Sequence, residues 1–152
     1  MSQRILRRRM EILLVEDSLE DARVTIQSLR HEDVACRVTL VRDGEEALRF
    51  LRREGVFARA PRPDLILLDL ELPMKDGCQV LTEVRADETL KAIPVIVLTA
   101  SLVHRTILEA RGLGVDGYMT KPVSLEQFIS VVKSLRRSWL NESIRAASGS
   151  EE

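Results

Sequence analysis

The chain of 152 residues has the length of one domain, so we expect a single hydrophobic core. Hydrophobic residues make up 45% and charged residues 31% of it, which excludes disordered and fibrous classes of protein. The formal net charge of −1 gives no global electrostatic reason to bind nucleic acid or a membrane. Because no apolar run reaches the roughly 18 residues of a membrane span, and the basic start lacks the apolar segment of a secretory signal, we expect a cytoplasmic protein.

Five segments are typical of β-strands. Three are short and continuously apolar, which indicates parallel strands buried on both faces, and they cover residues 11–15, 64–69 and 94–99. Residues 36–41 and 115–119 are weaker candidates. The sequence therefore predicts a sheet of five strands.

Segments with helical spacing lie between these strands. Apolar residues share one helical face in four of them: Ala22, Ile26 and Leu29; Val80, Leu81 and Val84; Val103, Ile107 and Ala110; and Leu125, Phe128, Ile129, Val132 and Leu135. Ser124 with Gln127 predicts a capping box at the start of the last helix. Asp43 with Glu46 marks the start of another helix, after the second strand.

This alternation of strands and helices predicts a doubly wound α/β domain with a parallel sheet and helices on both faces. We expect the domain to span residues 10–140, with a flexible basic extension at residues 1–9 and a flexible tail at residues 141–152. Residues 54–63 read as a longer loop before the third strand.

Polar residues gather at the predicted strand ends, where ligands bind in such sheets. The first strand ends in Glu16 and Asp17, the third in Asp69 and the fourth in Thr99, and the fifth runs into Lys121. Three converging carboxylates repel one another unless a cation holds them, and an oxygen-only set favours Mg²⁺ over Zn²⁺. Asp17 alone could equally cap the helix that follows it.

Asp69 is the candidate reactive group because its strand lies centrally in the predicted sheet. A carboxylate can attack phosphorus and form an acyl phosphate. Phosphoryl transfer needs in-line positioning and cations around the phosphoryl oxygens, which the metal and Lys121 would supply, with Thr99 donating a hydrogen bond. The sequence thus predicts a phosphoryl acceptor at Asp69.

Four motifs in this order resemble the receiver domains of bacterial two-component response regulators. They are Glu16-Asp17, Asp69 within residues 67–73 followed by Asp76-Gly77, Thr99-Ala100, and Lys121-Pro122. The resemblance implies a flavodoxin-like (CheY-like) fold with strand order 2-1-3-4-5. It also implies one bound Mg²⁺ and phosphorylation of Asp69 from the phosphohistidine of a histidine kinase.

The resemblance further assigns roles to single residues. Asp17 and Asp69 would bind Mg²⁺ directly, Glu16 through water, and Glu71 through its backbone carbonyl. Lys121 would pair with the phosphoryl group, and a cis peptide bond would precede Pro122.

A switch is implied as well. Thr99 and Tyr118 would change the surface around the fourth and fifth helices, and Glu71 and Ser101 occupy positions that tune the lifetime of the phosphoryl group.

The chain ends about thirty residues after Lys121, so we expect a single-domain regulator that signals by protein contact. Its loop from Phe57 to Pro63, its turn at residues 72–77 and the closing Ser138-Trp139-Leu140 resemble stand-alone receivers that work with bacterial phytochrome kinases. The expected partner is such a sensor histidine kinase or a phosphotransfer protein. Dimerisation through the fourth and fifth helices, with Trp139 at the contact, is implied for this subclass.

Three alternatives remain open from the sequence. An aspartate-nucleophile phosphatase resembles D-x-D-x-T, whereas Glu71 and Pro73 stand at the two later places here. A degenerate receiver that is never phosphorylated would act only as an adaptor. Nucleic-acid binding would depend on the arginines among residues 4–9. We expect a signalling protein rather than an enzyme, and the sequence identifies neither the kinase, its signal, the target nor the phosphoryl lifetime.

Overall fold

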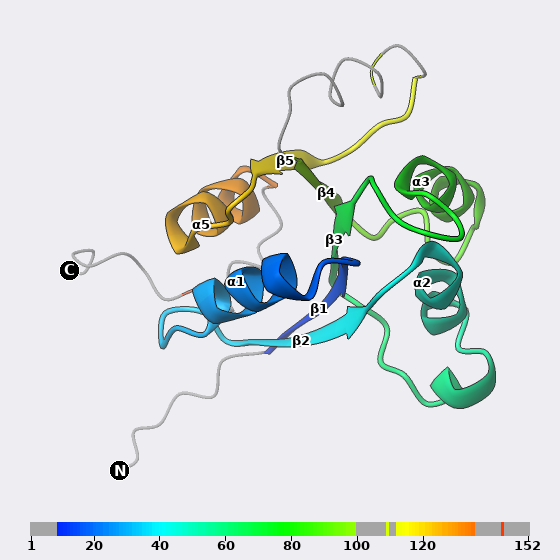
Figure 1. Ribbon diagram of the computed structural model, residues 1–152, viewed down its shortest axis with the longest axis horizontal. Helices are drawn as coiled ribbons and strands as arrows, with labels where there is room; N and C mark the ends of the chain where they lie inside the picture. Colours follow the sequence, from blue (N-terminus) through cyan, green and yellow to red (C-terminus); the bar gives the residue numbers. More distant parts are fainter. Residues whose placement is uncertain (1–8, 100–108, 110–111, 136–143, 145–152) are drawn as a thin grey trace.

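The computed structural model, which describes residues 9–99, 109, 112–135 and 144, is built around one parallel sheet (Figure 1). The strand order is β2-β1-β3-β4-β5, as the resemblance implied. The strands are β1 Met10–Val15, β2 Cys36–Val41, β3 Leu65–Asp69, β4 Val95–Thr99 and β5 Gly117–Thr120. The helices are α1 Leu19–Leu29, α2 Gly44–Leu51, α3 Gly77–Ala86 and α5 Leu125–Ser134, with a 3-10 turn η1 at Gly55–Phe57.

Apolar side chains of the central strands point alternately to two hydrophobic clusters, one on each face of the sheet. Leu13 and Val15 of β1 lie in the cluster under α2 and α3, whereas Ile12 and Leu14 lie in the cluster under α1 and α5. Every residue of β3 and β4 is buried, as their continuously apolar sequences predicted. Figure 1 shows α1 and α5 on one side of the sheet and α2 and α3 on the other.

Side-chain caps begin the helices, not always as predicted. Ser18 caps α1 by accepting the Asp21 N–H with its hydroxyl, so Asp17 is not the cap. Asp43 caps α2 by accepting the Glu46 N–H, which confirms that prediction. A complete capping box joins Asp76 and Gln79 at the start of α3, where the sequence analysis had not predicted one.

The capping box predicted for α5 forms only in part. The Ser124 hydroxyl accepts the Gln127 N–H as expected. The Gln127 side chain, however, accepts the Thr120 N–H and donates to the carbonyls of Thr120 and Pro122. It therefore ties α5 to the end of β5.

β5 begins two residues later than predicted because Asp116 closes the preceding loop onto β4. Its N–H donates to the carbonyl of Val95, and its carboxylate accepts the N–H of Val95.

The predicted fourth helix, with Val103 and Ile107, lies outside the described residues. The predicted loop at residues 54–63 contains η1, where the Phe57 ring packs edge-on against Phe50.

Ile144 is buried in the cluster under α1 and α5, although the sequence analysis placed it in a flexible tail. It forms an antiparallel bridge with Val34, in the connection between α1 and β2.

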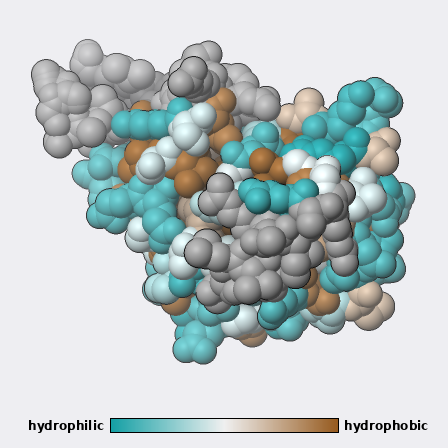
Figure 2. Space-filling model, turned by 90° about the horizontal axis from the view of Figure 1, so that it is seen from above, coloured by the Kyte–Doolittle hydropathy of each residue, from teal (hydrophilic) through white to brown (hydrophobic). Residues whose placement is uncertain are grey.

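Hydrophilic residues cover most of the described surface seen in Figure 2, with smaller apolar patches between them. In the part of the chain that the structure describes, no helix is long and apolar enough to cross a membrane.

Candidate functional site

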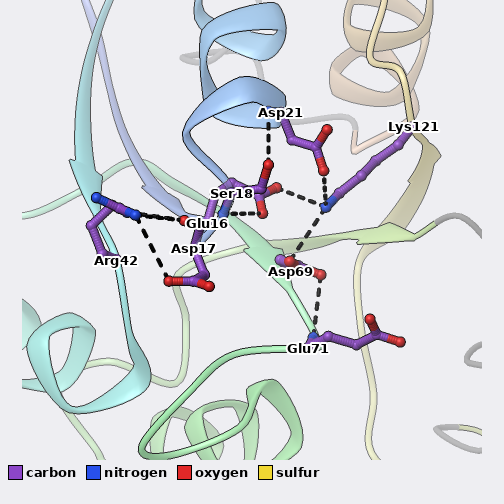
Figure 3. A network of polar contacts seen from close by, with 8 residues as sticks. All are labelled: Glu16, Asp17, Ser18, Asp21, Arg42, Asp69, Glu71 and Lys121. Carbon is purple, nitrogen blue, oxygen red and sulfur yellow. Dashed lines mark hydrogen bonds and ion pairs between the residues drawn. The ribbon is translucent and has the colours of Figure 1, made fainter.

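The carboxyl ends of four neighbouring strands place polar residues together at one edge of the sheet. Glu16 directly follows β1, Asp69 and Thr99 are the last residues of β3 and β4, and Lys121 directly follows β5. Because the strands are parallel and adjacent in the order β1-β3-β4-β5, these positions lie at the same edge. The predicted gathering of Glu16, Asp69 and Lys121 is therefore present (Figure 3).

The Lys121 ammonium is the centre of this arrangement. Its Nζ lies 2.8 Å from Oε1 of Glu16, 3.3 Å from Oδ2 of Asp69 and 3.2 Å from Oδ2 of Asp21. The Glu16 side chain is 1% exposed and that of Asp69 12% exposed, so two of these three ion pairs are shielded from water. Figure 3 shows the three carboxylates converging on Nζ from different elements.

Backbone groups hold the two buried carboxylates in place. The N–H of Glu71 donates to Oδ1 of Asp69 at 3.2 Å, and the N–H of Ser18 donates to Oε2 of Glu16 at 3.2 Å. The Lys121 N–H donates to the carbonyl of Thr99 at 3.0 Å, which joins the ends of β4 and β5. The peptide bond between Lys121 and Pro122 is cis, as the resemblance implied.

The surroundings of Glu16 and Lys121 raise the pKa of both side chains. Burial raises the pKa of Glu16 to about 7; the nearby Lys121 ammonium opposes this shift, and the Asp69 carboxylate adds to it. Burial tends to lower the pKa of the Lys121 ammonium, but Glu16, Asp69 and Asp21 together outweigh burial and raise that pKa above its ordinary value. Lys121 is therefore firmly protonated, and the negative charge around it exceeds its own.

Asp17 lies to the side of this cluster, beside Arg42. The Arg42 guanidinium donates from Nε and Nη2 to the backbone carbonyl of Asp17, at 3.1 and 2.8 Å. Oδ1 of Asp17 is 3.9 Å from Nη2, and the Asp17 side chain is 53% exposed. The structure thus joins Glu16 and Asp69 through Lys121 and pairs Asp17 with a second cation.

The available donors suit a hard divalent cation. Carboxylate and backbone carbonyl oxygens are the ligands that Mg²⁺ prefers. Oε1 of Glu16 is buried and accepts no well-formed hydrogen bond, although Lys121 is close, so it keeps acceptor capacity. Among the described residues, no group of three acidic, histidine or cysteine side chains is arranged so that it could hold a metal ion as it stands. The donor types therefore fit Mg²⁺. In this structure the carboxylates of Glu16 and Asp69 pair with Lys121 and that of Asp17 pairs with Arg42.

The predicted switch residues lie on neighbouring strands. Thr99 is 7% exposed at the end of β4, and Tyr118 in β5 is partly buried against the cluster under α2 and α3. Tyr118 pairs with Val97 in the sheet register, two residues before Thr99. Ser101, Trp139 and the fourth helix lie outside the described residues.

Three residues of the site were missed by the sequence analysis. Asp21 contacts Lys121 from the first turn of α1, Ser18 orients Glu16, and Arg42 binds Asp17. Arg42 did carry a signal in the sequence, because it directly follows β2 and so stands at a strand end like the other site residues. Asp21 carried no such signal, since it lies within a helix and 100 residues from its partner.

Comparison with known proteins agrees with this geometry. The family model described as "Response regulator receiver domain" matches residues 12–133. Response regulator Rcp1 of Synechocystis is 40% identical over 129 residues, which are 85% of this chain and 88% of the relative. The match covers most of both proteins.

Solved structures give the same result. The phosphorylated cyanobacterial phytochrome response regulator RcpA has a TM-score of 0.73 and 44% identity, over 92% of this chain and 100% of that one. The bacteriophytochrome response regulator RtBRR has a TM-score of 0.78 and 39% identity, over 84% and 78%. The Mn²⁺-bound form of Rcp1 has a TM-score of 0.69 and 40% identity, over 86% and 94%. The chain belongs to the response regulator receiver domain family and is similar to its phytochrome response regulators.

Proposed function

We propose that this protein is a cytoplasmic phosphorylation switch whose acceptor is Asp69. The carrying observation is the buried ion pair of Asp69 with Lys121 at the carboxyl end of the central strand. A phosphoryl group on Asp69 would lie next to a permanent cation. Membership of the receiver family supports the same role.

In the transfer step, an oxygen of the Asp69 carboxylate attacks the phosphorus of a phosphohistidine. The new O–P bond forms as the P–N bond breaks, and the electron pair of that bond stays with the leaving imidazole nitrogen. The Glu71 N–H holds Oδ1 of Asp69, which fixes the direction of the carboxylate. Lys121 faces Oδ2 and is placed to neutralise phosphoryl oxygens.

A bound Mg²⁺ would add charge neutralisation and a fixed geometry for the phosphoryl oxygens. Asp17 and Asp69, with Glu16 through water and the backbone carbonyl of Glu71, would hold it. The structure of Rcp1 with Mn²⁺ supports a divalent cation in this family. The Asp17 carboxylate lies 3.9 Å from Nη2 of Arg42 and its side chain is half exposed, so this carboxylate can turn to a cation at little cost.

For the output, Thr99 donates its hydroxyl to the phosphoryl group, and Tyr118 follows into the space that Thr99 vacates. The burial of Thr99 and the register of Tyr118 two residues away support this coupling. The readout is a protein contact around the fourth and fifth helices, which includes dimerisation. The phosphodonor is a sensor histidine kinase of the phytochrome type, because phytochrome response regulators are among the relatives.

The acceptor is tested by incubating the protein with Mg²⁺ and acetyl phosphate. We expect one added phosphate, labile in base, and its complete loss in Asp69→Asn, measured by intact-protein mass spectrometry. Asp76→Asn is a matched control, since Asp76 caps α3 and has no place in the site. A label that persists in Asp69→Asn would refute the proposal, and steady turnover of small phosphate esters would favour a phosphatase.

A further inference from the structure

We propose that Asp21 is a positioning residue that holds the Lys121 ammonium in the unphosphorylated protein and competes with the phosphoryl group for it. Asp21 would thus set how strongly the phosphorylated form is favoured. The inference rests on the proposed function, because it concerns the cation that pairs with the phosphoryl group. It assigns a role to a helix residue outside the strand ends that form the rest of the site.

Three carboxylates already surround the ammonium group of Lys121. A lysine ammonium carries three N–H bonds, and three carboxylates, those of Glu16, Asp21 and Asp69, lie within 3.3 Å of Nζ. A phosphoryl oxygen that pairs with this ammonium therefore competes with these carboxylates for it. The hydrogen bond from the Lys121 ammonium to the Asp21 carboxylate, at 3.2 Å, would thus oppose phosphorylation.

Asp21 is the partner that can be released at the lowest cost. Release of Glu16 would leave a charge unpaired at a site only 1% exposed, and Asp69 is the acceptor itself. The Asp21 side chain is 46% exposed and borders a cleft of about 270 Å³. Val24, Thr25, Lys121, Pro122 and Val123 complete its lining. Water can therefore replace the ammonium around Asp21.

The contact between Asp21 and Lys121 follows from the packing of α1. The N–H of Asp21 donates to the Ser18 hydroxyl at 3.1 Å, which fixes Asp21 in the first turn of the helix. Two turns later, the Ser28 hydroxyl donates to the carbonyl of Val123 at 2.8 Å, just beyond Lys121. The ion pair of Asp21 with Lys121 and the hydrogen bond of Ser28 with Val123 therefore hold α1 against the segment that carries Lys121.

Binding of trifluoroberyllate, which mimics a phosphoryl group on a carboxylate, tests the competition. Calorimetric titrations with Mg²⁺ would compare the parent protein, Asp21→Asn and the control Glu20→Gln. Glu20 lies in the same helical turn and is exposed, so its replacement removes one charge without touching Lys121. We expect Asp21→Asn to bind about three- to fivefold more tightly, and Glu20→Gln less than twofold.

A gain in affinity is the informative result, since structural damage at Asp21 would weaken binding. Unchanged or weaker binding in Asp21→Asn, or an equal gain in Glu20→Gln, would overturn the inference while the proposed function stands. Failure of the parent protein to bind would overturn both. Under the inference, the acetyl-phosphate reaction also reaches a higher phosphorylated fraction in Asp21→Asn than in the parent protein.

Discussion

Glu16 shows how one side chain acquires unusual chemistry from its position. It follows a buried strand, so its carboxylate is 1% exposed, and it shares Lys121 with Asp69 and Asp21. Desolvation is the largest effect on it, and one ammonium cannot fully balance three carboxylates. The raised pKa of Glu16 thus follows from its burial and from its position beside the Asp69 carboxylate.

This pKa predicts a pH dependence of stability in the presence of a metal chelator. The folded protein binds the Glu16 proton with a pKa of about 7, more tightly than the unfolded chain, whose ordinary value is 4.5. The free energy of unfolding should therefore fall as the pH rises from about 4.5 to about 7, by on the order of 2 kcal/mol. Urea unfolding followed by circular dichroism across this range measures it.

The matched variants for this experiment are Glu16→Gln and Glu45→Gln. Glutamine cannot ionise, so Glu16→Gln should lose this part of the pH dependence. The exposed Glu45, in the first turn of α2, should keep it when replaced. The same slope in Glu16→Gln and in the parent protein would show that Glu16 is not the titrating group.

At the scale of elements, the connection from β3 to α3 is folded tightly back against its neighbours. The Gly77 N–H donates to the carbonyl of Leu70 at 3.0 Å, and a Cβ on Gly77 would lie 2.7 Å from the carbonyl oxygen of Asp69. Within this turn, Met74 adopts a positive φ of 67°. The close packing fixes the backbone that follows Asp69, including the Glu71 N–H.

The first residue of α2 supports the same turn from outside. A Cβ on Gly44 would lie 1.9 Å from the carbonyl oxygen of Lys75, so Gly44→Ala must displace the turn or the helix. We expect a loss of about 1–3 kcal/mol in the free energy of unfolding, measured with urea. Phosphorylation by acetyl phosphate should also become slower, because the backbone around Asp69 shifts.

Gly114→Ala provides the control for this prediction. A Cβ there meets no atom within 4 Å, so we expect a change below about 1 kcal/mol. Equal effects of the two substitutions would mean that the contact with Lys75 is not what makes Gly44 necessary.

At the scale of the molecule, residues remote in sequence complete the core. Ile144 is 8% exposed and bridges Val34, beyond the segment that the helical pattern assigned to the domain. Ile144→Ala should lower the free energy of unfolding by roughly 2 kcal/mol, since it removes buried apolar contacts. Val24→Ala, at a site 38% exposed on α1, should change it little. Thermal and urea unfolding that do not distinguish the two variants would show that Ile144 adds nothing to the core.

The sequence by itself determined the order of the elements, the sheet, and the presence of Glu16, Asp69 and Lys121 at one edge. Hydrophobic periodicity reports which segments are strands, and parallel topology then aligns their ends. Only the tertiary structure decided that Asp21 shares Lys121, that Gly44 meets Lys75 and that Ile144 meets Val34. These contacts join elements that are distant along the chain, so they depend on how side chains pack between elements, which no local pattern encodes.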